Sequence, residues 1–320
     1  MLKDFKIGNI NIEGGLCLGP MAGVSDLPFR HLCKEMGASL LVTEMVSAKA
    51  IYFKNKNTEP LMKIDKGEHP IALQLFGSDP DIIAQMAASI EERDFDIFDF
   101  NMGCPVPKIV NNGEGSALMK NPKLVEEILI KLVKSVKKPV TLKIRKGFND
   151  DNINAVEIAK IAEGAGVSAV AVHGRTREQY YRGKANWQYI KKAKEAVKIP
   201  VFGNGDIFQE EDALAMLLST GVDGIALARG IQGNPFLIRA CRSLLSEGKK
   251  LPPVSLQERK EMMLRHLRLM VDIKGEHLAL LEMRKHLSWY MEGLENAARW
   301  RQRVNTENDL EKVFQMVREL

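Results

Sequence analysis

The stretch NMGCP, residues 101–105, places a cysteine at a corner of the chain. Gly103 lets the backbone turn, and Pro105 biases Cys104 away from helical dihedral angles, so the thiol can point at another molecule. A free cysteine has a pKa of about 8.5 and is mostly protonated near neutral pH. A thiol in this position could therefore donate a proton, a task that does not need the lowered pKa of a nucleophile.

The remaining cysteines, Cys17, Cys33 and Cys241, fit buried structural positions better. The four cysteines are widely spaced, form no Cys-x-x-Cys pair and have no histidine group nearby, so neither a metal site nor a disulfide framework is predicted. The first ten residues lack the apolar segment of a secretion signal, and no apolar run approaches the roughly 18 residues of a membrane span. We expect a cytoplasmic protein without membrane or metal.

Eight short apolar runs alternate with longer helical patterns along the first part of the chain. This alternation is typical of βα units around a parallel sheet. The runs cover residues 15–19, 39–45, 71–76, 96–101, 140–145, 168–174, 201–205 and 223–228. Eight such units within residues 1–248 predict a (β/α)₈ TIM barrel, and a doubly wound sheet is the alternative.

Helix boundary signals lie between these runs. Three pairs offer a helix N-cap followed by proline in the first turn, namely Asp79-Pro80, Asn121-Pro122 and Asn234-Pro235. Three glycines lie one or two residues before a predicted strand, where a left-handed residue would end the preceding helix: Gly37, Gly166 and Gly221.

Chemistry in a (β/α)₈ barrel takes place at the carboxyl ends of the strands. The predicted ends carry Pro20, Met21, Ala22, Glu44, Gln74, Asn101, Cys104, Lys143, Arg145, His173, Asn204, Gly205, Asp206, Ala228, Arg229 and Gly230. One polar residue at a strand end is commonly a satisfied structural group. Unusual residues at all eight ends, most of them polar, indicate a site.

The last two predicted strands end in GNGD (203–206) and ARG (228–230). Barrels often bind a phosphate group through backbone N–H groups at these two loops, and the arginine adds a bidentate partner. Lys143 could place a positive charge against a reduced flavin ring. The stretches GEGSAL and GNGDIF lack the third glycine of a dinucleotide loop. We infer a phosphate-bearing cofactor at the barrel rim.

Strand signals stop after the proline-containing segment 247–255, and the rest of the chain is helical in pattern. Ser255 and Glu258 form a capping box, and Thr306 with Asp309 marks the start of a last helix. We therefore predict a small all-helical C-terminal domain over residues 249–320. Within it, a group of basic residues surrounds aromatic ones in a mixture suited to RNA: Arg284, Lys285, His286, Arg299, Arg301 and Arg303 around Trp289, Tyr290 and Trp300. A solvated helix face over aromatic core residues is the alternative.

Six stretches together resemble the tRNA-dihydrouridine synthases, most closely their bacterial B-type branch. They are PMAGVSDLPFR (20–30), NMGCP (101–105), LKIRKGF (142–148), HGRTREQYYRGKANW (173–187), GNGDI (203–207) and ARG (228–230). The likeness extends from about Gly8 to about Arg303. It implies an FMN enzyme, re-reduced by NADPH, that saturates the C5–C6 bond of uridines in the tRNA D-loop. We also expect the protein to contact the D-loop and elbow of tRNA and to act as a monomer.

The resemblance also implies roles for single residues. Cys104 would be the catalytic acid, and Asn101, Arg145, Arg175 and Arg177 would meet the substrate. FMN would be held by Pro20, Met21, Ala22, Gln74, Lys143, His173, Asn204, Gly205, Asp206, Ala228 and Arg229.

Two other functions are open from the sequence. An FMN barrel could reduce a free pyrimidine or small enone, as dihydroorotate dehydrogenases do, although a small substrate does not need the appended helices. A non-catalytic RNA-binding protein is the other, and the presence of Cys104, Lys143, His173 and Arg229 together argues against it.

Overall fold

The structure, a computed structural model, describes residues 3–320. Eight parallel strands form a ring in the order β3-β11-β10-β9-β8-β7-β6-β4. They are β3 (Leu16–Leu18), β4 (Leu41–Val42), β6 (Ile71–Phe76), β7 (Ile97–Met102), β8 (Val140–Gly147), β9 (Ala169–Thr176), β10 (Val201–Asn204) and β11 (Gly224–Leu227). A parallel bridge between Cys17 and Leu40 closes the ring. The eight predicted strands and the TIM barrel are confirmed, and the doubly wound alternative is wrong.

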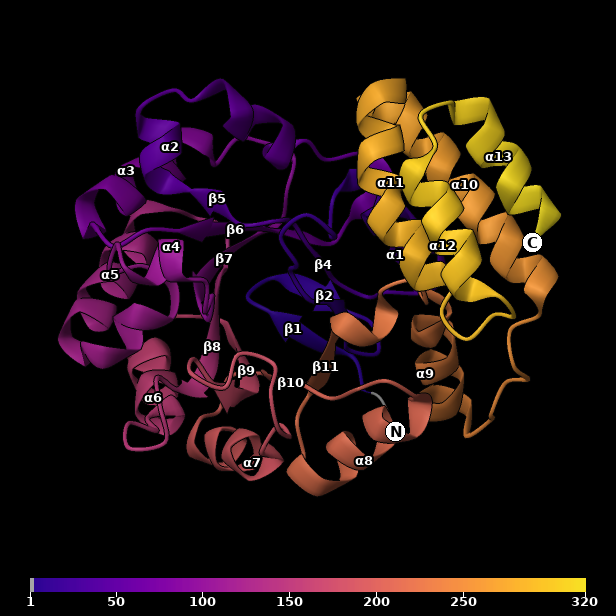
Figure 1. The fold of residues 1–320 in the computed structure, drawn as a ribbon. Helices are drawn as coiled ribbons and strands as arrows, with labels where there is room; N and C mark the ends of the chain where they lie inside the picture. Colours follow the sequence, from indigo (N-terminus) through magenta and orange to yellow (C-terminus); the bar gives the residue numbers. More distant parts are fainter. Residues whose placement is uncertain (1–2) are drawn as a thin grey trace.

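Helices surround the strands on the outside of the barrel (Figure 1). The long ones are α1 (Leu27–Glu35), α3 (Pro80–Ile90), α5 (Pro122–Ser135), α6 (Ala155–Gly164), α7 (Trp187–Ala196), α8 (Glu210–Thr220) and α9 (Phe236–Glu247). Shorter ones are α2 (Ala48–Tyr52), α4 (Pro107–Val110), η1 (Lys56–Met62), η2 (Lys66–Glu68), η3 (Gly115–Lys120) and η4 (Arg229–Ile231).

The helix boundary signals are confirmed with one exception. Asp79 and Asn121 accept hydrogen bonds from the first turns of α3 and α5, and Gly37, Gly166 and Gly221 all have positive φ. Asn234 does not cap α9, because Pro235 itself is the N-cap residue and the helix begins at Phe236.

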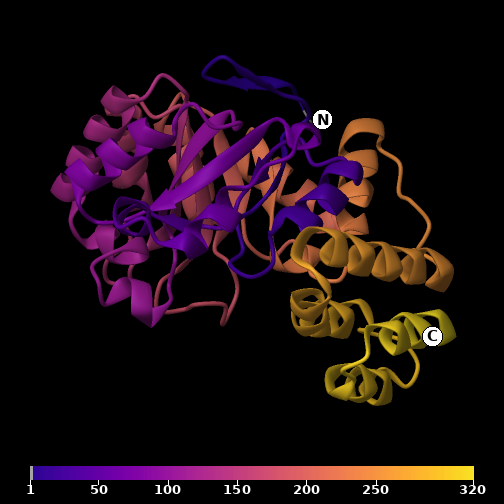
Figure 2. The same ribbon diagram turned by 90° about the horizontal axis from the view of Figure 1, so that it is seen from above.

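A β-hairpin that the sequence pattern did not reveal covers the amino end of the barrel. Its strands are β1 (Phe5–Ile7) and β2 (Ile10–Ile12), which pair antiparallel. Ile7 and Ile12 are fully buried in one cluster with residues from the barrel strands, such as Val42 and Phe202. In Figure 2 the indigo hairpin lies across the strand ends. The very short β5 (Val46–Ser47) was also not predicted.

Four helices follow the barrel and form a bundle, α10 (Leu256–Lys274), α11 (Glu276–Tyr290), α12 (Ala297–Thr306) and α13 (Leu310–Glu319). The predicted capping box of Ser255 and Glu258 starts α10. Thr306 does not start the last helix, because its hydroxyl donates to carbonyl oxygens in the last turns of α12; Asp309 alone caps α13. The exact residues at which the chain divides into two domains stay a prediction.

The bundle packs against α1 of the barrel (Figures 1 and 2). Its apolar core includes Leu32 of α1 and Phe236 of α9. The Lys274 ammonium donates to Asp26 at 2.6 Å, and Asp26 also caps α1. The bundle is therefore fixed to the element that directly follows the first strand-end loop.

Among residues 3–320, none of the helices combines the length and apolar character that a membrane crossing requires. Within the same range, no group of three or more His, Cys, Asp or Glu side chains is arranged to hold a metal ion.

Candidate active site

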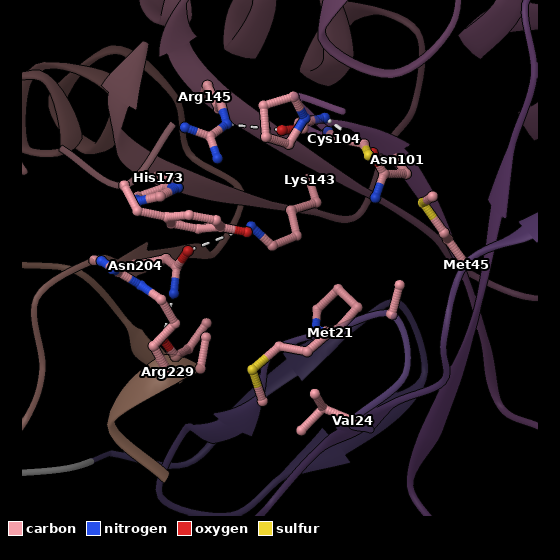
Figure 3. A pocket seen from close by; sticks show the side chains of 18 of the residues that line it. Met21, Val24, Met45, Asn101, Cys104, Lys143, Arg145, His173, Asn204 and Arg229 are labelled. Carbon is pink, nitrogen blue, oxygen red and sulfur yellow. Dashed lines mark hydrogen bonds between the residues drawn. The ribbon is translucent and has the colours of Figure 1, made fainter. Parts of the chain in front are cut away.

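A cavity of about 420 Å³ opens where the carboxyl ends of the barrel strands converge. All eleven residues predicted to hold the cofactor line it, together with Cys104, Asn101 and Arg145. Figure 3 shows Cys104, Lys143, His173, Asn204 and Arg229 around one cavity. Arg175 and Arg177 do not line this cavity. The structure therefore brings together nearly all of the predicted site.

Cys104 lies in a tightly held turn after β7. The Asn101 side-chain oxygen accepts hydrogen bonds from the N–H groups of Gly103 at 3.1 Å and Cys104 at 2.9 Å. The Cys104 carbonyl accepts from the Ser116 hydroxyl at 2.8 Å. Gly115 has a φ of +59°, and a Cβ there would stand 2.9 Å from that same carbonyl, so the position requires glycine. The turn is thus fixed from both sides.

The thiol of Cys104 is half-buried, whereas the other three cysteines are buried, as predicted. Burial raises the pKa of the Cys104 thiol above its ordinary value, and the nearby charges of Arg145 and Lys143 oppose this only in part. A thiol with a raised pKa stays protonated at neutral pH. The Cys104 thiol is therefore suited to donate a proton rather than to act as a nucleophile.

Lys143 extends from β8 into the cavity, where its ammonium group donates to the Asn204 side-chain oxygen at 3.3 Å (Figure 3). Asn204 is oriented in turn, because its amide nitrogen donates to the Ala226 carbonyl at 2.7 Å. Burial and the neighbouring Arg145 lower the pKa of Lys143 to about 8. The site therefore holds a positive charge that lacks a carboxylate partner at salt-bridge distance among the described residues.

His173 forms part of the same wall. Burial and the positive charges around it, Arg145 first, hold the pKa of His173 well below its usual range, so the imidazole is neutral. Gly205 packs directly on this ring with a φ of +119°. A Cβ on Gly205 would stand 2.9 Å from the His173 ring and 2.9 Å from the Ala185 side chain. Only glycine fits at this position of the cavity wall.

Asp206 organises the arginines on the side formed by the last two strands. Its carboxylate binds Arg175 at 2.7 Å and accepts from the Ala185 N–H at 2.7 Å, and Arg229 lies 3.5 Å away. Arg175 is only 2% exposed and also donates to the Gly183 carbonyl. It therefore holds Asp206 in place from outside the cavity, where a direct contact with substrate was expected.

Arg145 and Arg177 differ in their surroundings. The Arg145 guanidinium donates to the Gly103 carbonyl at 2.8 Å and to the carbonyls of Thr176 and Tyr180 at 2.8 and 2.9 Å, which connects β8 to the Cys104 turn. Arg177 instead lies over the ring of Phe148. Of these two arginines, only Arg145 reaches the cavity.

Sequence reasoning missed several residues of the site. Tyr181 and Phe208 are about half exposed at the cavity, and the Arg229 guanidinium lies 4.5 Å from the Tyr181 ring centre. Met45 and Val24 add apolar wall. Asp99, below the cavity, was also missed, although the alternation in FDFN (98–101) turns Asp99 and Asn101 to the same face of the strand and was a usable signal for it.

The strand ends of this parallel barrel carry a protonated thiol, a neutral imidazole and positive charge without a carboxylate at salt-bridge distance among the described residues, next to glycines that have no side chain. This combination is suited to an oxidoreductase with an anionic, phosphate-bearing cofactor.

The comparisons with known proteins identify the family. The family model described as Dihydrouridine synthase (Dus) matches residues 17–319. A probable tRNA-dihydrouridine synthase of Rickettsia bellii is 42% identical over 95% of this chain and 94% of its own. tRNA-dihydrouridine synthase B of Pseudomonas syringae is 41% identical over 99% of this chain and 94% of its own, and that of Shewanella oneidensis is 42% identical over 90% and 89%. The chain belongs to the dihydrouridine synthase family, its B-type branch, and is a flavin-dependent oxidoreductase.

A solved structure of histamine dehydrogenase from Rhizobium sp. 4-9 shares the fold. It superimposes with a TM-score of 0.55 at 13% identity, covering 84% of this chain and 50% of that one. At this identity the likeness concerns the barrel architecture alone.

The lowered pKa of Lys143 predicts a pH dependence of stability. Between about pH 8 and about 10.5 the folded, flavin-free protein has released this proton and the unfolded chain has not, so the free energy of unfolding rises with pH. Lys143→Met removes both the titration and the burial of the ammonium group. Its stability relative to wild type should be most favourable at or below pH 8 and should decline toward pH 10.5. Urea titrations of both proteins test this, and a difference independent of pH would contradict it.

Proposed function

We propose that this chain reduces the C5–C6 double bond of uridine in the D-loop of tRNA, with FMN as cofactor, NADPH as reductant and Cys104 as proton donor. The observation that carries the proposal is the protonated thiol of Cys104 on the same cavity as the buried ammonium of Lys143. The protein forms dihydrouridine in tRNA, as its family membership indicates. The identity of the cofactor, the reductant and the acid is the part that we infer.

The cavity suits FMN on three grounds. Gly205 and Gly230 line the cavity without side chains, and both positions require glycine, since a Cβ on Gly230 would stand 2.0 Å from the Ile207 carbonyl oxygen. Arg229 projects beside them as a partner for phosphate oxygens. Lys143 would face the ring system, with Gln74 and His173 on the same wall. When bound, FMN supplies a hydride to uracil C6.

Hydride addition at C6 leaves negative charge on C5 and O4 of the uracil, and the reduced bond persists only when C5 receives a proton. The Cys104 thiol is held by its turn at the cavity and is protonated. It would release that proton to C5 and become a thiolate, which the nearby guanidinium of Arg145 and ammonium of Lys143 would stabilise. The thiolate then takes a proton from water.

A uridine in folded tRNA reaches such a cavity only when it is unstacked, which is easiest in a loop. The bundle offers a second contact for the RNA. Part of the basic and aromatic group predicted there is structural: His286 and Tyr290 are fully buried, and Arg284 donates to the Glu307 carbonyl. We assign the RNA contact to α12, which carries Arg299, Arg301 and Arg303.

A free pyrimidine or small enone as substrate would not explain the helical bundle. A non-catalytic RNA-binding role would not explain the residues assembled around the cavity. Action as a monomer in the cytoplasm completes the proposal.

The cofactor assignment predicts that the purified protein is yellow and releases FMN on denaturation. Arg229→Ala should lose a charge-assisted contact of about 1.5–3 kcal/mol, which corresponds to roughly 10- to 100-fold weaker FMN binding. Arg239→Ala is the control, because Arg239 is a surface residue paired with Glu258 on α10. Flavin fluorescence titration measures both. Release of FAD, or equal FMN affinity in the two variants, would overturn the assignment.

Cys104→Ala should separate the two half-reactions. NADPH should reduce the bound flavin at a near wild-type rate, because that step needs no proton at uracil. Reoxidation by unmodified tRNA should slow by about 10²–10⁴-fold, the usual loss for a positioned acid. Stopped-flow flavin absorbance follows each step, with Cys241→Ala as a control for loss of a buried thiol. Reoxidation at the wild-type rate would show that the proton has another source.

The RNA surface is tested by charge reversal on the bundle. Arg299→Glu should weaken tRNA binding and reduce the slope of log affinity against log salt by about 1, as expected for one lost phosphate contact. Arg268→Glu on α10 is the matched control, since both arginines are exposed. Filter binding over a range of salt measures both, and NADPH oxidation should be unaffected. Identical behaviour of the two variants would place the RNA surface elsewhere than on α12.

A further inference from the structure

The interior of the barrel contains one carboxylate whose presence the reaction itself does not explain. Asp99 lies in the middle of β7 and is 6% exposed. It borders a small apolar space below the active-site cavity, together with side chains such as Val42, Ala72 and Phe202. Burial raises the pKa of Asp99, and the hydrogen bonds from Thr141 and Gln74 and the nearby charge of Lys143 oppose this only in part. No described Lys, Arg or His side chain lies at salt-bridge distance from it. An unpaired buried carboxylate is costly and therefore needs a reason.

Asp99 is the end of a chain of side-chain hydrogen bonds that leads to Cys104. The Gln74 amide nitrogen donates to Asp99 at 2.6 Å. The Gln74 oxygen accepts from the Asn101 amide nitrogen at 2.7 Å. The Asn101 oxygen accepts from the N–H groups of Gly103 and Cys104. Three strand-borne side chains thus connect the barrel interior to the turn that holds the thiol.

The direction of each bond in this chain is fixed by the one before it. A backbone N–H can only donate, so Asn101 must turn its oxygen to the Cys104 turn and its NH₂ group to Gln74. Gln74 must then present its oxygen to Asn101 and its NH₂ group to Asp99. This series of hydrogen bonds is complete only when residue 99 offers an acceptor. Asp99 does so with one oxygen, while its other oxygen accepts from the Thr141 hydroxyl at 2.7 Å.

We propose that Asp99 is a positioning residue that fixes the amide orientations of Gln74 and Asn101 and thereby holds the turn that presents Cys104. Its importance for uridine reduction rests on the proposed function, whereas its effect on the turn does not. Without an acceptor at position 99, no hydrogen bond holds the NH₂ group of Gln74 toward residue 99. If the Gln74 amide reverses, two NH₂ groups meet between Gln74 and Asn101, and Asn101 is no longer held against the turn.

The test compares two variants of Asp99 in the full-length flavin-loaded protein. Asp99→Leu removes the acceptor. Asp99→Asn keeps an oxygen for Gln74 and turns an NH₂ group to the Thr141 hydroxyl oxygen, so it restores the chain without the charge. The readout is the rate at which iodoacetamide modifies Cys104 at fixed pH, followed by peptide mass spectrometry. The other cysteines are buried and serve as internal references for folding.

We expect Asp99→Leu to speed modification of Cys104 about tenfold or more, because the loosened turn exposes the thiol. Asp99→Asn and the control Thr141→Val should stay within about twofold of wild type, since neither removes the acceptor for Gln74. Reoxidation of the reduced flavin by tRNA should slow in Asp99→Leu and recover in Asp99→Asn. An unchanged rate of modification in Asp99→Leu would overturn the proposal, as would equal effects of Leu and Asn, which would indicate that charge alone matters.

Gln74→Met provides a second route if Asp99→Leu does not fold. It interrupts the series of hydrogen bonds one link closer to Cys104 and should also speed the modification of the thiol about tenfold or more. An unchanged rate of modification in Gln74→Met would overturn the proposal. If no variant and no wild-type protein reduces uridine, the proposed function fails, but the modification rates still decide the role of Asp99.

Discussion

Closure of the barrel is the constraint on which the site depends. The parallel pairing of β11 with β3 sets Leu227 beside Leu18, and the bridge from Cys17 to Leu40 completes the ring. This closure places the loop of Pro20 to Ala22 against Ala228 and Arg229, although the two segments are at opposite ends of the barrel sequence. An open sheet with the same strands would leave these two walls apart. The cavity exists because the ring is complete.

The closed ring also buries positively charged side chains in an environment of low dielectric constant. Arg145 is nearly buried and donates to carbonyl oxygens, which orient it without neutralising it. Asp206 compensates only on the side of Arg175 and Arg229. The remaining excess of positive charge around Lys143 is unfavourable in the protein alone and favourable for an anionic guest. The same burial that lowers the pKa of Lys143 therefore strengthens its attraction to such a ligand.

The sequence predicted the strands and most of the cavity because both follow from local pattern and barrel topology. Apolar runs fix the strands, and the residue after each run must lie at the same rim. The hairpin β1–β2 was missed because its three-residue strands carry too little alternation to stand out. Arg175 does not line the cavity, because a residue near a strand end can turn either inward or toward a neighbouring loop, and its contact with substrate stays a prediction. His286 and Tyr290 were grouped with residues suited to RNA, with an aromatic core as the alternative, because helix pattern alone does not show that α10, α11 and the barrel enclose them.

The hairpin has a consequence for kinetics. Because Ile7 and Ile12 fill the amino end of the barrel, substrates reach the cavity from the side where the carboxyl ends of the strands lie. The dinucleotide reductant and the tRNA loop of the proposed reaction must then enter by the same opening, one after the other. The proposed reaction would then follow ping-pong kinetics, in which each partner leaves before the other binds, and a high concentration of tRNA would slow turnover by occupying the oxidised form.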